Sequence, residues 1–132
     1  MKDREFDLEE RLIDFAVRII KLTEALPHAL SGNHIRGQIL RSGTAPAPNY
    51  GEAQSAESRG DFVHKIKIAL KELRETKVWL RMIGKAALIE PVSKLDPLIK
   101  ENDELISILV ASVKTAKKNK TRLSAKETHE PQ

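Results

Sequence analysis

The sequence contains no cysteine, and this absence excludes disulfide-stapled folds and thiolate metal sites. Long apolar runs are also missing, since none approaches the roughly 20 residues that a membrane span requires. The first twelve residues, MKDREFDLEERL, are too highly charged for a secretory signal. We therefore expect a cytoplasmic protein that has no membrane partner.

Aromatic residues and glycine are scarce: aromatics make up 4% of the 132 residues, and there are 6 glycines. Charged residues make up 32%, and Leu, Ile and Val are plentiful, which excludes a disordered chain. This balance is typical of a helical protein. The length predicts one domain, and a chain near this size buries about two-thirds of its unfolded surface.

The net charge of +4 is unevenly distributed. Residues 1–113 hold 17 basic and 17 acidic side chains, so the whole excess lies after residue 113. Within the body, residues 59–85 carry a net charge of +5 and residues 88–104 a net charge of −3. The overall charge is therefore weak evidence for nucleic-acid binding, and the local charge has to be examined.

A first helix is expected from Leu8 to Leu26, with Asp7 as N-cap, Glu10 in the capping-box position and Pro27 after its end. Its apolar residues fall on two faces, although a bundle helix needs only one. The main face carries Leu8, Leu12, Phe15, Ile19, Leu22 and Leu26, and the second face carries Ile13, Val17 and Ile20. Ile108 likewise points away from the main face of its own helix. We predict that Ile13, Val17, Ile20 and Ile108 form an oligomer interface, because soluble monomers rarely expose a large apolar patch. The alternative is that residues 46–57 or the second helix cover this face within one chain.

A second helix is predicted to start near Asn33. Pro46 and Pro48 then remove two backbone donors. Either the helix ends here, or it is kinked and resumes through Tyr50 to Glu57; the pattern favours a break.

Ser58 and Asp61 form a capping pair at the start of a third helix, which is expected to end near Gly84. Its core positions repeat as a strict heptad: Phe62, Ile66, Ala69, Leu73, Thr76, Leu80 and Ile83. A fourth helix is predicted from Ser93 or Asp96 to about Lys118. Its buried face carries Leu95, Leu98, Ile99, Asn102, Leu105, Ile106, Leu109 and Val113. Residues 1–118 are thus predicted to form an up-down antiparallel four-helix bundle, all-α and oligomerising, and residues 119–132 a disordered basic tail.

Two groups of cations are candidates for nucleic-acid binding. Lys67, Lys71, Arg74, Arg81 and Lys85 lie within about 80° on the third helix. Lys114, Lys117 and Lys118 lie near the end of the fourth. Such cations can contact phosphates, but the alternative is a solvated face balanced by Glu72, Glu75 and the acidic start of the fourth helix. Few aromatic residues are available to stack on bases.

Other chemistry has little support in the sequence. Asp61 and His64 make one D-x-x-H fragment, whereas bundle metal sites use two such pairs and further carboxylates. There is no catalytic triad pattern, phosphate-binding loop or dinucleotide fingerprint. Asn102 interrupts an apolar face and is interpreted as a residue that fixes helix register. We expect no enzyme activity, metal, cofactor or small-molecule substrate.

Several motifs resemble the bacterial four helix bundle protein family, also called the 23S rRNA intervening-sequence or S23 proteins. They are the segments QILRS at residues 38–42, PNYGEA at 48–53, SRGDF at 58–62, HKI at 64–66, KELRET at 71–76 and WL at 79–80. The resemblance covers roughly residues 6–119. Relatives commonly have one proline where this chain has Pro46 and Pro48.

The resemblance implies up-down bundles that assemble into ring-like homopentamers, some of them encoded within insertions of large-subunit rRNA genes. A related branch, the accessory variability determinants of diversity-generating retroelements, binds nucleic acid and a reverse transcriptase. Two functional hypotheses follow. The first is an oligomeric bundle that binds nucleic acid, RNA before DNA. The alternative is a scaffold that binds only proteins.

Overall fold

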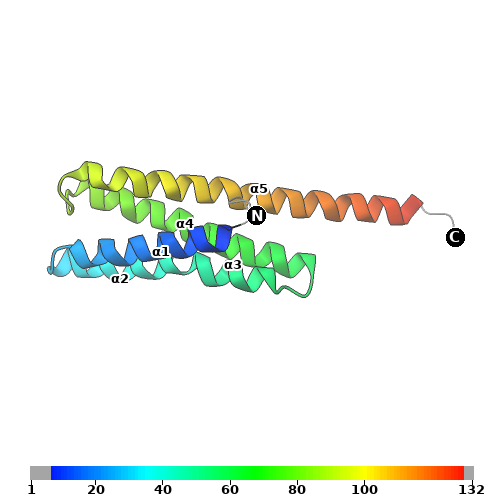
Figure 1. The fold of residues 1–132 in the computed structure, drawn as a ribbon, viewed down its shortest axis with the longest axis horizontal. Coiled ribbons are helices and arrows are strands. Elements are labelled where there is room, and N and C mark those ends of the chain that lie inside the picture. The colour runs from blue at the N-terminus through cyan, green and yellow to red at the C-terminus, as the bar shows by residue number, and fades with distance from the viewer. Residues whose placement is uncertain (1–6, 130–132) are drawn as a thin grey trace.

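The computed structural model describes the backbone of residues 7–129 and the side chains of residues 7–119. Its elements are, in chain order, α1 (Leu8–Ala25), α2 (Leu30–Thr44), α3 (Pro46–Gln54), α4 (Arg59–Lys85), the 3-10 turn η2 (Val92–Leu95) and α5 (Asp96–His129). Every element of these described residues is helical, which confirms the predicted all-α class. α2 and α3 follow one another along the bundle and together form one of its four members (Figure 1).

The first helix has the predicted extent and the predicted buried face. Leu12 and Ile19 are fully buried and Phe15 is 1% exposed. Asp7 occupies the predicted N-cap position, and its carbonyl accepts from the Arg11 N–H, but its side chain accepts no capping hydrogen bond. The Asp7 backbone lies at φ −94° and ψ 42°, outside the extended region from which a cap side chain reaches the first-turn N–H groups.

The helix through Pro46 is kinked and not broken, so the break that the sequence favoured is wrong. Ala45 alone separates α2 from α3, and its dihedral angles, φ −68° and ψ −33°, are helical. Its N–H donates to Arg41 O (3.1 Å) and its carbonyl accepts from the Asn49 N–H (3.2 Å). Pro46 is tolerated because it opens the first turn of α3, where a missing N–H loses no hydrogen bond. At its other end, α2 starts at Leu30, before the predicted Asn33.

The third predicted helix, α4, is confirmed in cap, core and end. The Ser58 Oγ accepts the Asp61 N–H at 3.0 Å. All heptad positions from Ile66 to Ile83 are fully buried, and Phe62 is partly buried. After Lys85 the chain turns at Ala87, which has a φ of 53°. The Leu88 N–H donates to Ile83 O and the Ala87 N–H to Gly84 O, which is the Schellman ending of a helix.

The last helix is longer than predicted. α5 starts at Asp96 with Pro97 in its first turn, as expected, but it runs to His129, so the predicted end near Lys118 is wrong. Residues 119–129 contain no proline or glycine, and their Lys, Arg, Leu and Ala residues favour a helix. Of the predicted tail, residues 130–132 lie outside the described residues. The end of α5 projects beyond the other helices (Figure 1).

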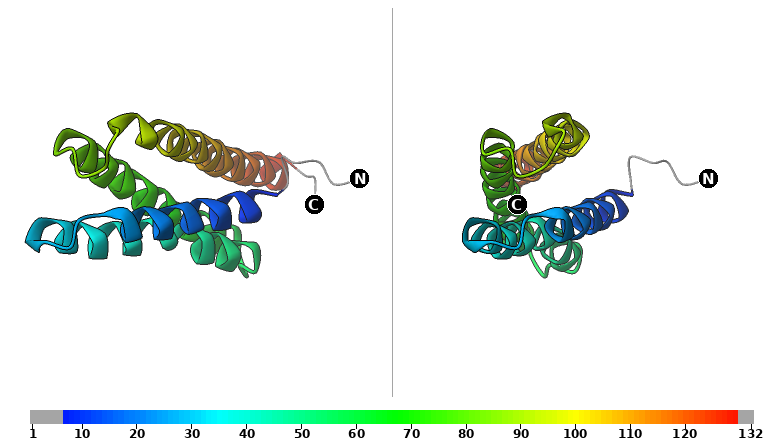
Figure 2. Two further views of the ribbon diagram at one scale, coloured as in Figure 1. Left: turned by 60° about the vertical axis from the view of Figure 1, so that its left-hand side comes forward. Right: turned by 90° about the vertical axis from the view of Figure 1, so that its left-hand side faces the viewer.

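The helices occupy the corners of the bundle in a definite order. α1 packs on α2, α3 and α5, and α4 packs on the same three elements. α1 and α4 therefore lie on opposite corners, which the view along the bundle makes visible (Figure 2). Their outward faces consequently lie on opposite sides of the molecule.

Candidate nucleic-acid interface

The two groups of candidate cations meet in one groove between α4 and α5. The groove has a volume of about 530 Å³. Its walls carry Lys67, Lys71 and Arg74 from α4 and Lys114 and Lys117 from α5. Leu70, Val110 and Val113 line its floor. Residues more than 30 positions apart in the sequence thus form one cationic surface, which we call the α4–α5 groove.

Four of the five cations that line this groove have no ion-pair partner within the described part of the chain. Among residues 7–119, Lys67, Lys71, Arg74 and Lys114 form no ion pair. The neighbouring Lys67 ammonium lowers the pKa of Lys117, because a hydrogen bond and the repulsion between the two cations favour the neutral amine. Cations held this close together favour the binding of an anion.

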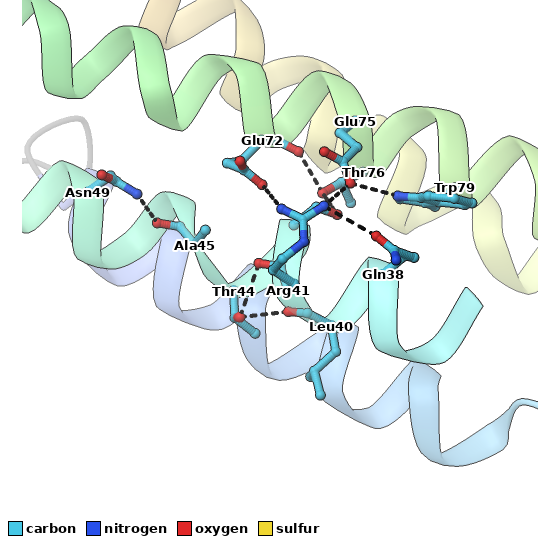
Figure 3. A network of polar contacts seen from close by, with 11 residues as sticks. Gln38, Leu40, Arg41, Thr44, Ala45, Asn49, Glu72, Glu75, Thr76 and Trp79 are labelled. Carbon is cyan, nitrogen blue, oxygen red and sulfur yellow. Dashed lines mark hydrogen bonds and ion pairs between the residues drawn. The ribbon is translucent and has the colours of Figure 1, made fainter. Parts of the chain in front are cut away.

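The carboxylates that were candidates for balancing this charge are engaged elsewhere. Glu72 accepts from Arg41 of α2 at 2.8 Å, and Glu75 also pairs with Arg41. Both bonds point toward α2, away from the α5 side of α4 (Figure 3). Glu72 and Glu75 thus pair with Arg41 and form no ion pair with the cations of the groove. At the acidic start of α5, Glu101 pairs with Arg11 and Asp103 with Lys77.

The remaining candidate cations lie outside the groove. Arg81, Lys85 and Lys118 are exposed, but none of them lines it. Arg81 and Lys85 continue the cationic face of α4 beyond the end of the groove, toward the turn after Lys85.

A second hollow lies between the α3–α4 turn and α5, and it is larger, about 790 Å³. Its charged lining residues are Arg59 and Glu57, and its α5 side consists of Ser112, Thr115, Ala116 and Asn119. One cation beside one acid gives no net charge for phosphates. The smaller α4–α5 groove is therefore the better candidate.

A polar network that the sequence did not predict joins α2 to α4 (Figure 3). The Trp79 Nε1–H donates to the Glu75 carboxylate at 3.0 Å, so Glu75 serves both Trp79 and Arg41. The hydroxyls of Ser42 and Thr76, both fully buried, hydrogen-bond to one another at 2.8 Å. These residues fall within the motifs on which the family resemblance rests, and their role here is to hold two helices together.

Asn102 lies, as predicted, in the interior of the bundle and is fully buried. Its Nδ2 donates to the carbonyl of Leu73 on α4 at 3.2 Å, while its Oδ1 has no partner among the described residues. The bond fixes one register between α4 and α5, because a slip of either helix would leave both amide atoms unpaired.

The predicted interface residues of α1 are exposed in the single chain. Ile13, Val17 and Ile20 are 40%, 42% and 40% exposed, so neither α2 nor residues 46–57 cover them. Ile108 differs, since it is partly buried against the core. The structure thus places three of the four residues on one open apolar face.

The remaining sequence candidates show no further site. Asp61 is partly buried at the start of α4, where its N–H bonds to Ser58, and His64 is exposed. Among the side chains that the structure describes, no three His, Asp or Glu residues gather closely enough to hold a metal ion. Over the same residues, no helix combines the length and the apolar character that crossing a bilayer requires.

Comparison with known proteins identifies the class and then the family. The fold is an up-down four-helix bundle of a kind already seen in a solved structure. This is the crystal structure of a protein with unknown function from the S23 ribosomal protein family of Bacteroides thetaiotaomicron VPI-5482. The two chains share 34% identity with a TM-score of 0.75, over 81% of this chain and 98% of that chain.

The family of 23S rRNA-intervening sequence proteins matches residues 4–111, and the chain belongs to this family. No curated protein matches the sequence. The match ends at residue 111, so α4 contributes matched residues to the groove, whereas Lys114 and Lys117 follow the matched part.

Proposed function

We propose that this chain is a non-enzymatic, homo-oligomeric bundle that binds nucleic acid, RNA before DNA, in the α4–α5 groove. The observation that carries this proposal is the convergence of five cationic side chains from two helices on one groove. Phosphate contacts require cations on an accessible surface, and four of the five, Lys67, Lys71, Arg74 and Lys114, form no ion pair among residues 7–119. The description of the family, which refers to 23S rRNA, supports RNA as the first ligand to test.

The sequence of the ligand is not expected to matter strongly. Phe62, Tyr50 and Trp79 do not line the groove, so it lacks a platform on which bases stack. Binding would then depend on contacts with the phosphates of the nucleic acid. The family resemblance suggests an assembly of five copies, and the nucleic acid would be held around this assembly.

The test is binding of fluorescent single-stranded RNA, measured by anisotropy at several salt concentrations. If all five groove cations contact phosphates, the logarithm of the binding constant should fall with the logarithm of salt with a slope of about −3.5 for a single strand. The variant Lys67→Glu, Lys114→Glu, Lys117→Glu should bind at least about tenfold more weakly and with a shallower slope.

The matched control is Arg18→Glu, Lys94→Glu, Lys100→Glu, which changes the net charge equally at exposed positions outside the groove. It should retain most of the affinity. Equal losses in both variants would mean that only net charge matters, and wild-type binding by the groove variant would refute the groove.

A protein-binding scaffold is the second candidate, and the exposed α1 face favours it. An apolar protein interface depends little on salt, whereas phosphate binding weakens steeply. A wild-type protein that binds no RNA at low salt but forms oligomers in light scattering would favour the scaffold.

A further inference from the structure

The outward face of α1 is a second heptad-spaced seam. Glu10, Ile13, Val17, Ile20 and Glu24 follow a 3-4-3-4 spacing, and all five are exposed. We call these residues the α1 outer seam. By helical geometry the cation of α1 nearest to its centre line is Lys21, about 60° away, and Arg11 and Arg18 lie at least about 120° away. The seam therefore combines an apolar middle with an acidic residue at each end.

The outward face of α4 has the same spacing and the opposite charge. Lys71, Arg74, Val78, Arg81 and Lys85 again follow 3-4-3-4, and all are exposed. We call them the α4 outer seam. Val78 at its centre is 48% exposed, and the adjacent Met82 is 45% exposed. No acidic residue of α4 lies within about 60° of this centre line.

The two seams match when Val17 is placed against Val78. Glu10 and Glu24 then lie seven residues, about 10.5 Å, on either side of the centre, and so do Lys71 and Lys85. Opposite charges consequently meet whether the helices run parallel or antiparallel. Ile13 and Ile20 meet Arg74 and Arg81, whose aliphatic stems can cover apolar surface while the guanidinium groups stay in water.

One chain cannot make this contact by itself, because α1 and α4 occupy opposite corners of the bundle (Figure 2). We propose that copies of this chain associate head to tail, with the α1 outer seam of one copy docked on the α4 outer seam of the next. This inference rests on the oligomeric part of the proposed function and specifies its interface. A contact between two different surfaces builds a ring when the rotation closes, whereas a contact of α1 with α1 would stop at a dimer.

The docked seam leaves most of the nucleic-acid groove open. Lys67, Lys114 and Lys117 are not part of the α4 outer seam, while Lys71 and Arg74 belong to both surfaces. In the assembled oligomer the phosphate contacts would fall to these three lysines, and the slope of the salt dependence would be about −2 instead of the value for five cations. RNA binding and assembly can therefore be tested with different variants.

The experiment is light scattering on the purified full chain at micromolar concentration without nucleic acid. The wild type should be an oligomer. The variant Glu10→Lys, Glu24→Lys makes both seams basic and should fall to the monomer mass, as should Lys71→Glu, Lys85→Glu, which makes both acidic. The fourfold variant that combines these changes exchanges the charges and should recover the wild-type mass.

Two control variants carry the same charge changes at exposed positions outside both seams: Glu57→Lys, Glu104→Lys and Arg18→Glu, Lys100→Glu. Both should stay oligomeric. Circular dichroism checks that each variant is folded, and recovery in the fourfold variant excludes misfolding as the cause of dissociation.

The possible failures are distinct. A wild-type monomer would overturn the oligomer itself. An oligomer that Lys71→Glu, Lys85→Glu leaves intact, or a folded fourfold variant that stays monomeric, would overturn only the head-to-tail contact. If the groove variant loses RNA binding while the mass of its oligomer is unchanged, both the oligomer and the head-to-tail contact are still supported.

Discussion

α4 contacts α2 on one side and α5 on the other, and the two sides differ in how many of their charged side chains are paired. Toward α2, Arg41 is paired with Glu72 and Glu75, and buried hydroxyls bond across the contact. Toward α5, Asn102 donates to the Leu73 carbonyl and one ion pair, Lys77–Asp103, crosses the contact. At the rim of the groove, Lys67, Lys71, Arg74 and Lys114 form no ion pair among residues 7–119. Charges satisfied within the chain hold helices together, whereas charges left unsatisfied on an accessible groove are available to a ligand.

The largest expected effect is a loss of stability on replacing Leu73, which takes part in the packing of α4 and in its bond with α5. Leu73 is fully buried at the centre of α4, and its carbonyl also accepts from Asn102. Leu73→Ala should lower the free energy of unfolding by about 2–5 kcal/mol, because a cavity replaces well-packed side-chain atoms. Urea unfolding followed by circular dichroism measures the loss. A loss below about 0.5 kcal/mol would contradict the assigned core.

A smaller loss is expected on the α2 side alone. Thr76→Val keeps the shape of the side chain but removes the hydroxyl that bonds to Ser42, and the buried Ser42 hydroxyl loses this partner. The unfolding free energy should fall by about 1–3 kcal/mol. The double variant Ser42→Ala, Thr76→Val should recover part of this loss, since no hydroxyl is then left behind. An unchanged stability in Thr76→Val would mean that the pair contributes nothing.

Neutralising one cation on each side tests the comparison directly. Arg41→Gln removes two ion pairs and should cost up to about 1 kcal/mol, because the Arg41 side chain is 50% exposed and solvent screens such pairs. Lys114→Gln removes a cation of the groove that lies outside the α4 outer seam, and it should leave stability unchanged within about 0.5 kcal/mol. Both are measured by urea unfolding. Equal losses would remove the distinction between the two sides.

The smallest expected effect is a change in the pKa of Lys117. Lys67→Met removes the cation whose proximity lowers the pKa of Lys117. The pKa of Lys117 should therefore rise toward its ordinary value, which NMR of the lysine side chain across the alkaline range can follow. Lys94→Met, a distant exposed site, should leave it unchanged. A pKa that does not move in Lys67→Met would show that these two side chains are not neighbours in solution.

The sequence could predict what depends on local periodicity. The heptad of α4 identified its core from Ile66 to Ile83, and the Ser58 cap followed from a three-residue spacing. The family resemblance found in the motifs is confirmed by the match over residues 4–111. The exposure of Ile13, Val17 and Ile20 also followed from counting apolar faces.

Features that depend on distant partners were not predictable in this way. Arg41 reads as an ordinary surface residue until Glu72 and Glu75, more than 30 positions away, are placed beside it. The groove likewise requires the antiparallel register that brings Lys67 near Lys117. Asp7 takes the predicted N-cap position but its side chain makes no capping bond, since that bond depends on backbone angles that residue type does not determine.

The kink at Ala45 affects how far along the long helix α4 its partner helices stay in contact with it. Straight helices in a bundle cross at about 20°, so a partner that touches the middle of a long helix diverges from it toward both ends. α4, with 27 residues, is about 40 Å long. Coiled coils keep contact over such lengths by winding around one another. Here α2 and α3 both pack on α4, and the bend between them at Ala45 lets a second segment take up the contact with α4 where the first one ends.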